Sequence, residues 1–146
     1  MFYHNINPVL MQIGPLHIRY YGLFYAIGFV IAYFLIYYLA KRKQIGITKD
    51  YVADLIMYLI IGVVSGARFA YVLFYNLPYY ASNPLEIFAV WQGGLSFHGG
   101  LIGAIIAVYI FCRKKKIEFY DLADIAVIPV ALALALGRIG NFINGE

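Results

Sequence analysis

The segment Tyr20–Ala40 reads YYGLFYAIGFVIAYFLIYYLA, and its 21 residues carry no charged side chain. As an α-helix, a segment of this length spans about 30 Å, which is the thickness of the hydrocarbon core of a bilayer. The whole chain has 146 residues, of which 64% are hydrophobic and 12% are charged. Soluble domains carry roughly 25% charged residues, and the mean hydropathy of +0.79 also favours lipid as the surrounding solvent. The sequence therefore predicts an integral membrane protein.

Three more apolar stretches are long enough to cross a membrane, at about 55–77, 95–112 and 122–143. Arg68 interrupts the first of these, and Pro129 and Arg138 interrupt the last. Because proline lacks a backbone donor, Pro129 predicts a kink in that helix. Together with 20–40, these stretches predict an all-α, polytopic membrane protein with four transmembrane helices in a single domain, 1–146.

Lysine and arginine gather in two of the loops between these stretches. Loops 41–50 and 113–120 each contain four of them, whereas segment 76–94 contains none. Because short basic loops stay on the cytoplasmic side of a membrane, the two basic loops are predicted to lie inside. The N-terminus, segment 76–94 and the C-terminal end of the last helix are then predicted to lie outside. A net charge of +4 confined mostly to such loops does not indicate nucleic-acid binding.

Segment 76–94 has a helical pattern of its own. Asn83 can cap a helix, and Pro84 suits a first helical position because the N–H that proline lacks is unpaired there anyway. Apolar residues then recur at three-residue spacing: Leu85, Phe88 and Trp91. This pattern predicts a short helix lying in the membrane interface, where tryptophan is common. The pattern does not decide between an ordinary interfacial loop and a gate for substrate.

Arg68 and Arg138 are the clearest chemical signal in the apolar stretches. A guanidinium at the centre of a span costs about 2.5–3.5 kcal/mol on insertion scales, so such an arginine is usually present for function. Both arginines are predicted toward the outer ends of their helices, and the guanidinium fork matches two phosphate oxygens. Together they predict a site for an anionic headgroup. The alternative is that each side chain extends to the interface, which suits Arg138 better than Arg68.

A faint repeat connects the two arginine-containing helices. Asp54 precedes Arg68 by 14 residues, and Asp124 precedes Arg138 by the same number. In a helix, 14 residues rise about 21 Å. Each carboxylate is therefore predicted near the inside surface and each arginine near the outer leaflet. With so few identities, chance is an equal explanation.

His98 begins the third apolar stretch at the predicted depth of the arginines. Glycines flank it and let a backbone and a ligand approach closely, and Gly99 is a candidate for substrate contact. His98 is therefore a candidate base, with a hydrogen-bonded structural histidine as the alternative. The spacings Gly99-x-x-x-Gly103 and Gly62-x-x-x-Gly66 are also typical of closely packed helices, and we expect that role at Gly62, Gly66 and Gly103.

Four other polar residues lie near the predicted outer ends of the first and last helices. They are Tyr21, Asn141, Asn144 and Glu146. Tyrosine is common in the aromatic belt of a membrane interface, so a belt residue is the default interpretation of Tyr21. Amides and a carboxylate close behind Arg138 can orient it or bind substrate, or they can belong to a polar loop that leaves the helix.

Four blocks of the sequence resemble the prolipoprotein diacylglyceryl transferases, bacterial inner-membrane enzymes that attach a lipid to a cysteine. The blocks are 18–22 (IRYYG), 66–76 (GARFAYVLFYN), 91–103 (WQGGLSFHGGLIG) and 137–146 (GRIGNFINGE). The resemblance, which extends over essentially the whole chain, implies a seven-span enzyme of the bacterial cytoplasmic membrane. Its N-terminus is outside, in agreement with the loop charges, and its active site faces the outer leaflet. Three implied spans and a second essential arginine are missing here, so these 146 residues alone are expected to be inactive.

The implied reaction moves the diacylglyceryl group of phosphatidylglycerol to the lipobox cysteine thiol in the signal peptide of a preprolipoprotein. It forms a thioether, releases glycerol phosphate and is the first step of lipoprotein maturation. By resemblance, His98, Arg138 and Tyr21 match catalytic positions, and Asn141 and Glu146 match positions of the substrate-binding motif. No metal or organic cofactor is expected.

Two functions of other classes fit the same residues. Intramembrane arginines also mark permeation paths, so a small lipid or anion transporter is one alternative. A structural membrane protein, whose glycines only pack helices, is the other. A transporter needs polar groups that reach both faces, whereas the intramembrane charges here are predicted toward the outer leaflet.

Overall fold

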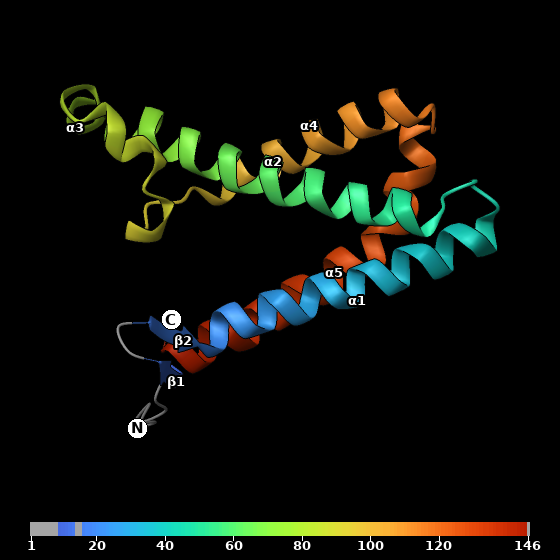
Figure 1. The fold of residues 1–146 in the computed structure, drawn as a ribbon, viewed down its shortest axis with the longest axis horizontal. Helices are drawn as coiled ribbons and strands as arrows, with labels where there is room; N and C mark the ends of the chain where they lie inside the picture. The colour runs from blue at the N-terminus through green and yellow to red at the C-terminus, as the bar shows by residue number, and fades with distance from the viewer. Residues whose placement is uncertain (1–8, 14–15, 146) are drawn as a thin grey trace. The chain divides into compact units, whose positions relative to one another are not determined.

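The computed structural model describes residues 9–13 and 16–145 (Figure 1). The chain forms two compact units, one made of residues 1–48 and 120–146 and the other of residues 49–119. Within the described residues, four helices are long and apolar enough to cross a membrane. The predicted all-α membrane fold is thereby confirmed.

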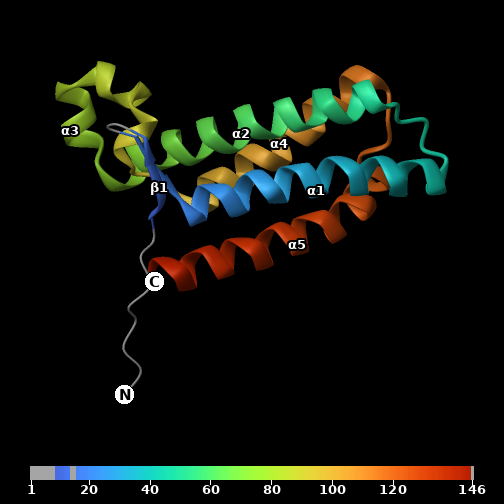
Figure 2. The same cartoon turned by 60° about the horizontal axis from the view of Figure 1, so that its bottom comes forward.

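The first unit pairs the first and last long helices. Helix α1 (Tyr20–Lys43) and helix α5 (Phe119–Asn144) run side by side in both views (Figures 1 and 2). They approach closely at Gly28, where an added Cβ would lie 3.5 Å from the Cβ of Ala133. At the far end of the pair, Lys43 Nζ lies 3.0 Å from a carboxylate oxygen of Asp124.

A short hairpin that the sequence did not predict precedes α1. Strand β1 (Val9–Ile13) pairs with strand β2 (Leu16–Arg19) in antiparallel register, with Gln12 opposite His17. These strands are too short and too mixed in polarity to give a clear alternating pattern, which is why the sequence analysis missed them.

The second unit contains two long helices and an irregular connection between them. Helix α2 (Lys49–Tyr75) and helix α4 (Phe97–Lys115) pack against each other. Between them lie helix α3 (Leu77–Ser82) and two 3₁₀ turns, η1 (Pro84–Phe88) and η2 (Val90–Gln92). The chain leaves α2 and enters α4 at the same end of this helix pair, so segment 76–94 lies at that end.

Glycines bring α2 and α4 close together. A Cβ added to Gly62 would lie 2.6 Å from the carbonyl oxygen of Gly103, and one added to Gly103 would collide with the carbonyl oxygen of Gly62. Gly66 and Gly99 oppose each other in the same way. The predicted packing role of Gly62, Gly66 and Gly103 is confirmed.

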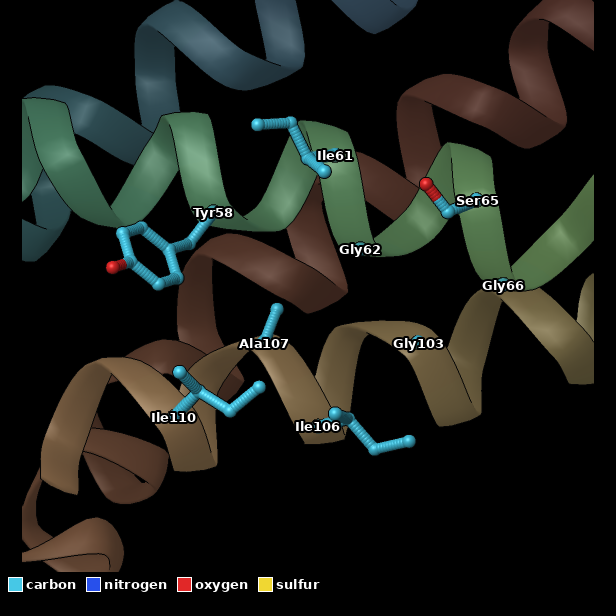
Figure 3. A pocket seen from close by; sticks show the side chains of 9 residues that line it. All are labelled: Tyr58, Ile61, Gly62, Ser65, Gly66, Gly103, Ile106, Ala107 and Ile110. Carbon is cyan, nitrogen blue, oxygen red and sulfur yellow. The ribbon is translucent and has the colours of Figure 1, made fainter.

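The small side chains leave an apolar groove of about 400 Å³ along one face of this helix pair (Figure 3). Its lining residues are Tyr58, Ile61, Gly62, Ser65, Gly66, Gly103, Ile106, Ala107 and Ile110. The groove follows from the same glycines that allow the close approach, because they contribute no side chain to fill it.

The helices extend beyond the predicted spans at their charged ends. Helix α2 begins at Lys49 rather than Leu55, and α5 begins at Phe119 rather than Leu122. Charged residues can occupy the first turns of these helices because those turns need no apolar surroundings. Helix α5 runs through Pro129 as one element, and Pro129 itself is buried.

Each unit has a lysine–aspartate pair at one end. In the second unit, Lys115 Nζ lies 2.7 Å from Asp54, and in the first unit Lys43 pairs with Asp124. The two aspartates of the sequence repeat therefore have similar partners, each a lysine from the last turn of the other long helix of the same unit. Both pairs are partly exposed, so each contributes at most about 1 kcal/mol.

The glycine contact predicts a sharp difference between two alanine variants of α4. Gly103→Ala places a methyl group against the backbone of α2, whereas at Gly100 the added Cβ would lie 3.5 Å from its nearest neighbours. We expect Gly103→Ala to lower the free energy of unfolding by about 1–3 kcal/mol and Gly100→Ala to change it little. An SDS titration of the purified protein in micelles measures both, and equal midpoints would contradict the close contact.

Candidate active site

Arg68 on α2 is buried, with 3% of its surface exposed. Within the described residues, its guanidinium donates to four backbone carbonyl oxygens. The acceptors are Glu86 O at 2.7 Å, Ile87 O at 2.9 Å, Gly93 O at 2.5 Å and Gly94 O at 3.2 Å. Arg68 therefore binds two stretches of segment 76–94 at once, and a phosphate would have to displace these contacts.

An aromatic ring and two glycines complete the surroundings of Arg68. The guanidinium carbon lies 5.0 Å from the centre of the buried Tyr80 ring, a favourable cation–π distance. Gly93 and Gly94 have φ angles of +89° and +73°, which other residues rarely adopt. A Cβ on Gly94 would also lie 2.5 Å from Tyr71 and 3.0 Å from Arg68 Nη1. Glycine is needed at this position for both reasons.

The predicted helix in segment 76–94 starts where the sequence placed it. Pro84 is the first residue of η1, but Asn83 makes no side-chain cap and instead donates from Nδ2 to Tyr79 O at 3.1 Å. The three predicted interfacial side chains are exposed: Leu85 (84%), Phe88 (73%) and Trp91 (79%). They belong to two 3₁₀ turns rather than to one continuous helix.

Glu86, the one acidic residue of this segment, bonds to a tyrosine. The Tyr79 hydroxyl donates to Glu86 Oε2 at 2.6 Å, and this bond to the carboxylate raises the pKa of Tyr79. The carboxylate of Glu86 thus has a partner other than Arg68, although its backbone carbonyl accepts from Arg68.

His98 is the second residue of α4, and its side chain is exposed. The helix start is held by Ser96, whose Oγ accepts from Gly99 N at 3.3 Å and whose N–H donates to Ala67 O at 2.9 Å. This cap was not predicted, although a serine directly before an apolar helix is a recognisable N-cap signal. Gly99 itself packs against Gly66, so the structure gives it a role in helix contact.

Arg138, Asn141 and Asn144 all lie in the last turns of α5, in the first unit. The helix continues to Asn144, so the segment behind Arg138 does not leave the helix. Arg138 is exposed and Asn141 is partly buried one turn further along. Asn144 Oδ1 is buried without a hydrogen-bond partner among the described residues. The three side chains follow each other at three-residue spacing and are close neighbours on one helix.

The remaining predicted residues are less fully described. Tyr21 is the second residue of α1 and belongs to the same unit as Arg138, and Glu146 lies outside the described residues. Arg68, His98 and Gly99 belong to the other unit. Among residues 9–13 and 16–145, no group of three or more His, Cys, Asp or Glu side chains could hold a metal ion.

Comparison with known proteins gives a consistent result. A model of the family "Prolipoprotein diacylglyceryl transferase" matches residues 8–146. Curated relatives named phosphatidylglycerol–prolipoprotein diacylglyceryl transferase are 52% identical in Geobacter sulfurreducens, 46% in Legionella pneumophila (strain Lens) and 47% in Francisella tularensis subsp. novicida.

These alignments cover 146, 144 and 145 residues, which are 100%, 99% and 99% of the chain. They cover 56%, 56% and 54% of the relatives, so the chain spans about half the length of the curated relatives it matches. On the match of the family model to residues 8–146, supported by these identities, the chain belongs to the prolipoprotein diacylglyceryl transferase family.

Proposed function

We propose that the full-length protein transfers the diacylglyceryl group of phosphatidylglycerol to the lipobox cysteine of preprolipoproteins in the bacterial cytoplasmic membrane. The observation that carries this proposal is the 52% identity, over the whole chain, to a relative that is named for this transfer. The structure supports it with an exposed arginine and an exposed histidine near helix ends, Arg138 and His98.

The chemistry assigns a role to each of these two side chains. The cysteine sulfur attacks the glyceryl carbon that carries the phosphate ester, a C–S bond forms and the C–O bond breaks. The bonding electron pair leaves with glycerol phosphate, and the thiol proton goes to His98 as base. Arg138 takes the role of the guanidinium that stabilises the charge that grows on the phosphate. Asn141, one helical turn away, adds a neutral donor.

The other predicted residues take supporting roles in this proposal. Tyr21 and Glu146 rest on their match to family positions. The buried Oδ1 of Asn144 has no hydrogen-bond partner among the described residues, and a substrate hydroxyl could donate a hydrogen bond to it. For Gly99, the predicted substrate contact, the packing against Gly66 and Ala70 favours a role in helix contact instead. Arg68 has no assigned contact with the phosphate, because its donors are occupied by carbonyl oxygens.

One assay separates the proposed transfer from the transporter and structural alternatives. The full-length protein is incubated with a lipobox peptide and phosphatidylglycerol, and the mass of the peptide is measured by mass spectrometry. We expect the mass of one diacylglyceryl group on the cysteine and an equal amount of released glycerol phosphate. An unmodified peptide in the presence of folded protein would refute the proposed function.

The proposed orientation predicts which cysteines an impermeant thiol reagent reaches. Leu85→Cys lies in the exposed part of segment 76–94, and Glu118→Cys lies in a basic loop. We expect the reagent to label the first from outside intact cells and the second only after the membrane is opened. The native Cys112 is buried and gives the background. The reverse pattern would place His98 on the wrong side for this reaction.

Replacement of Arg138 by lysine should be more damaging than the unchanged charge suggests. Lysine keeps a point charge but loses the planar fork that holds two phosphate oxygens. We expect turnover to fall by about 100-fold, the equivalent of about 3 kcal/mol of transition-state stabilisation. Arg113→Lys, at the opposite end of its helix from His98, is the matched control and should stay near wild type. Near-normal turnover in Arg138→Lys would show that only positive potential is needed.

Replacement of His98 by glutamine should give a pH-dependent defect. Glutamine keeps a hydrogen-bonding side chain but cannot accept the thiol proton. Because a free cysteine has a pKa of about 8.5, the substrate ionises by itself at high pH. We therefore expect a large loss of activity at neutral pH and partial recovery above pH 9 or so. A glutamine variant that is equally active across the pH range would make His98 structural.

A further inference from the structure

The hydrogen bonds of Arg68 connect two separate pieces of backbone. A guanidinium has five N–H donors, and Arg68 uses donors on all three of its nitrogens. Nη2 donates to Glu86 O and Nε donates to Ile87 O, whereas Nη1 donates to both Gly93 O and Gly94 O. A lysine ammonium has its donors on a single nitrogen and could not bond to residues 86–87 and 93–94 at the same time in this geometry.

No carboxylate accompanies this buried charge among the described residues. The carboxylate of Glu86 accepts from Tyr79, and the charge of Arg68 is compensated by carbonyl dipoles and by the face of Tyr80. Removal of Arg68 would take this donor from the carbonyls of Ile87, Gly93 and Gly94, and each such loss costs free energy, whereas Glu86 O also accepts from the Ala89 N–H. The irregular segment therefore depends on this side chain.

The same turn of α2 also fixes the start of α4. Ala67 O accepts from Ser96 N, Gly66 packs against Gly99, and Arg68 holds Gly93 and Gly94. Three consecutive residues of α2 thus hold the chain immediately before and after His98. Any shift of this turn moves the imidazole relative to α2.

We propose that Arg68 is a positioning residue for His98, and that it does not bind the substrate phosphate. It holds segment 86–94 on α2 and so fixes the angle at which α4 presents the imidazole. This inference rests on the proposed function for its kinetic part, because it concerns the same base. Arg68 and Arg138 then have different tasks, the first on the backbone and the second on the phosphate.

Kinetics of Arg68→Gln and Arg68→Lys in the full-length protein test the proposal. We expect both variants to lose about 100-fold in kcat, because a displacement of about 1 Å is enough for such a loss, with little change in the apparent KM for phosphatidylglycerol. Arg113→Gln is the charge-matched control. A raised KM with rescue by lysine would instead make Arg68 a phosphate ligand and overturn the proposal.

A double-mutant cycle with His98→Gln shows whether Arg68 acts through His98. We expect Arg68→Gln to cause no further loss in the His98→Gln background. A loss that is equally large in both backgrounds would mean a general structural role and would overturn the proposal. Should Arg68→Gln fail to fold, Gly94→Ala serves instead, because it disturbs the same contacts and leaves the guanidinium in place.

A nitroxide on Leu85→Cys gives a readout that does not depend on the reaction. We expect the label to become more mobile in Arg68→Gln than in the wild-type background and to be unchanged in Arg113→Gln. Unchanged mobility in Arg68→Gln would refute the hold on segment 86–94. If the wild-type protein transfers no diacylglyceryl group, the proposed function fails, while the label still decides whether Arg68 holds the segment.

Discussion

A membrane offers no water to a backbone N–H or C=O, and every such group must find a partner within the protein. The four long helices of this chain meet that requirement by themselves. Segment 76–94 contains no long helix, and four of its carbonyl oxygens accept from Arg68 on the neighbouring helix α2. The backbone groups of this chain are thus paired in two ways, by regular helices and by one buried arginine.

The two units are built on one plan. Each joins two long helices through a contact at small residues, with glycine facing alanine at Gly28 and glycine facing glycine between α2 and α4. Each also has a lysine–aspartate pair at one end. The small residues allow the close approach of the two helices, and the partly exposed ion pair adds at most about 1 kcal/mol at one end. Asp54 and Asp124, the aspartates of the faint sequence repeat, each belong to one of these ion pairs.

The sequence predicted the helices well and the contacts of the site only partly. Uninterrupted apolar length indicates a span wherever it occurs, and a G-x-x-x-G spacing indicates close packing. The partners of Arg68 could not be predicted, because they are backbone carbonyls, which every residue has. The Gly93–Gly94 pair and Ser96 were visible in the sequence, but their meaning depends on the fold that brings them beside α2. The hairpin before α1 gave too short a pattern to recognise.

The two proposed roles of Arg68 and Arg138 follow from the different surroundings of their guanidinium groups. Both follow an aspartate by 14 residues, and both are costly in hydrocarbon. Arg68 lies where the chain turns back beside its helix, so carbonyl oxygens occupy its donors before any ligand arrives. Arg138 lies near the end of α5 and is exposed. Since a phosphate gains most from a guanidinium whose donors are free, the exposed arginine is the one suited to the anion. The buried arginine is suited to holding the structure around His98.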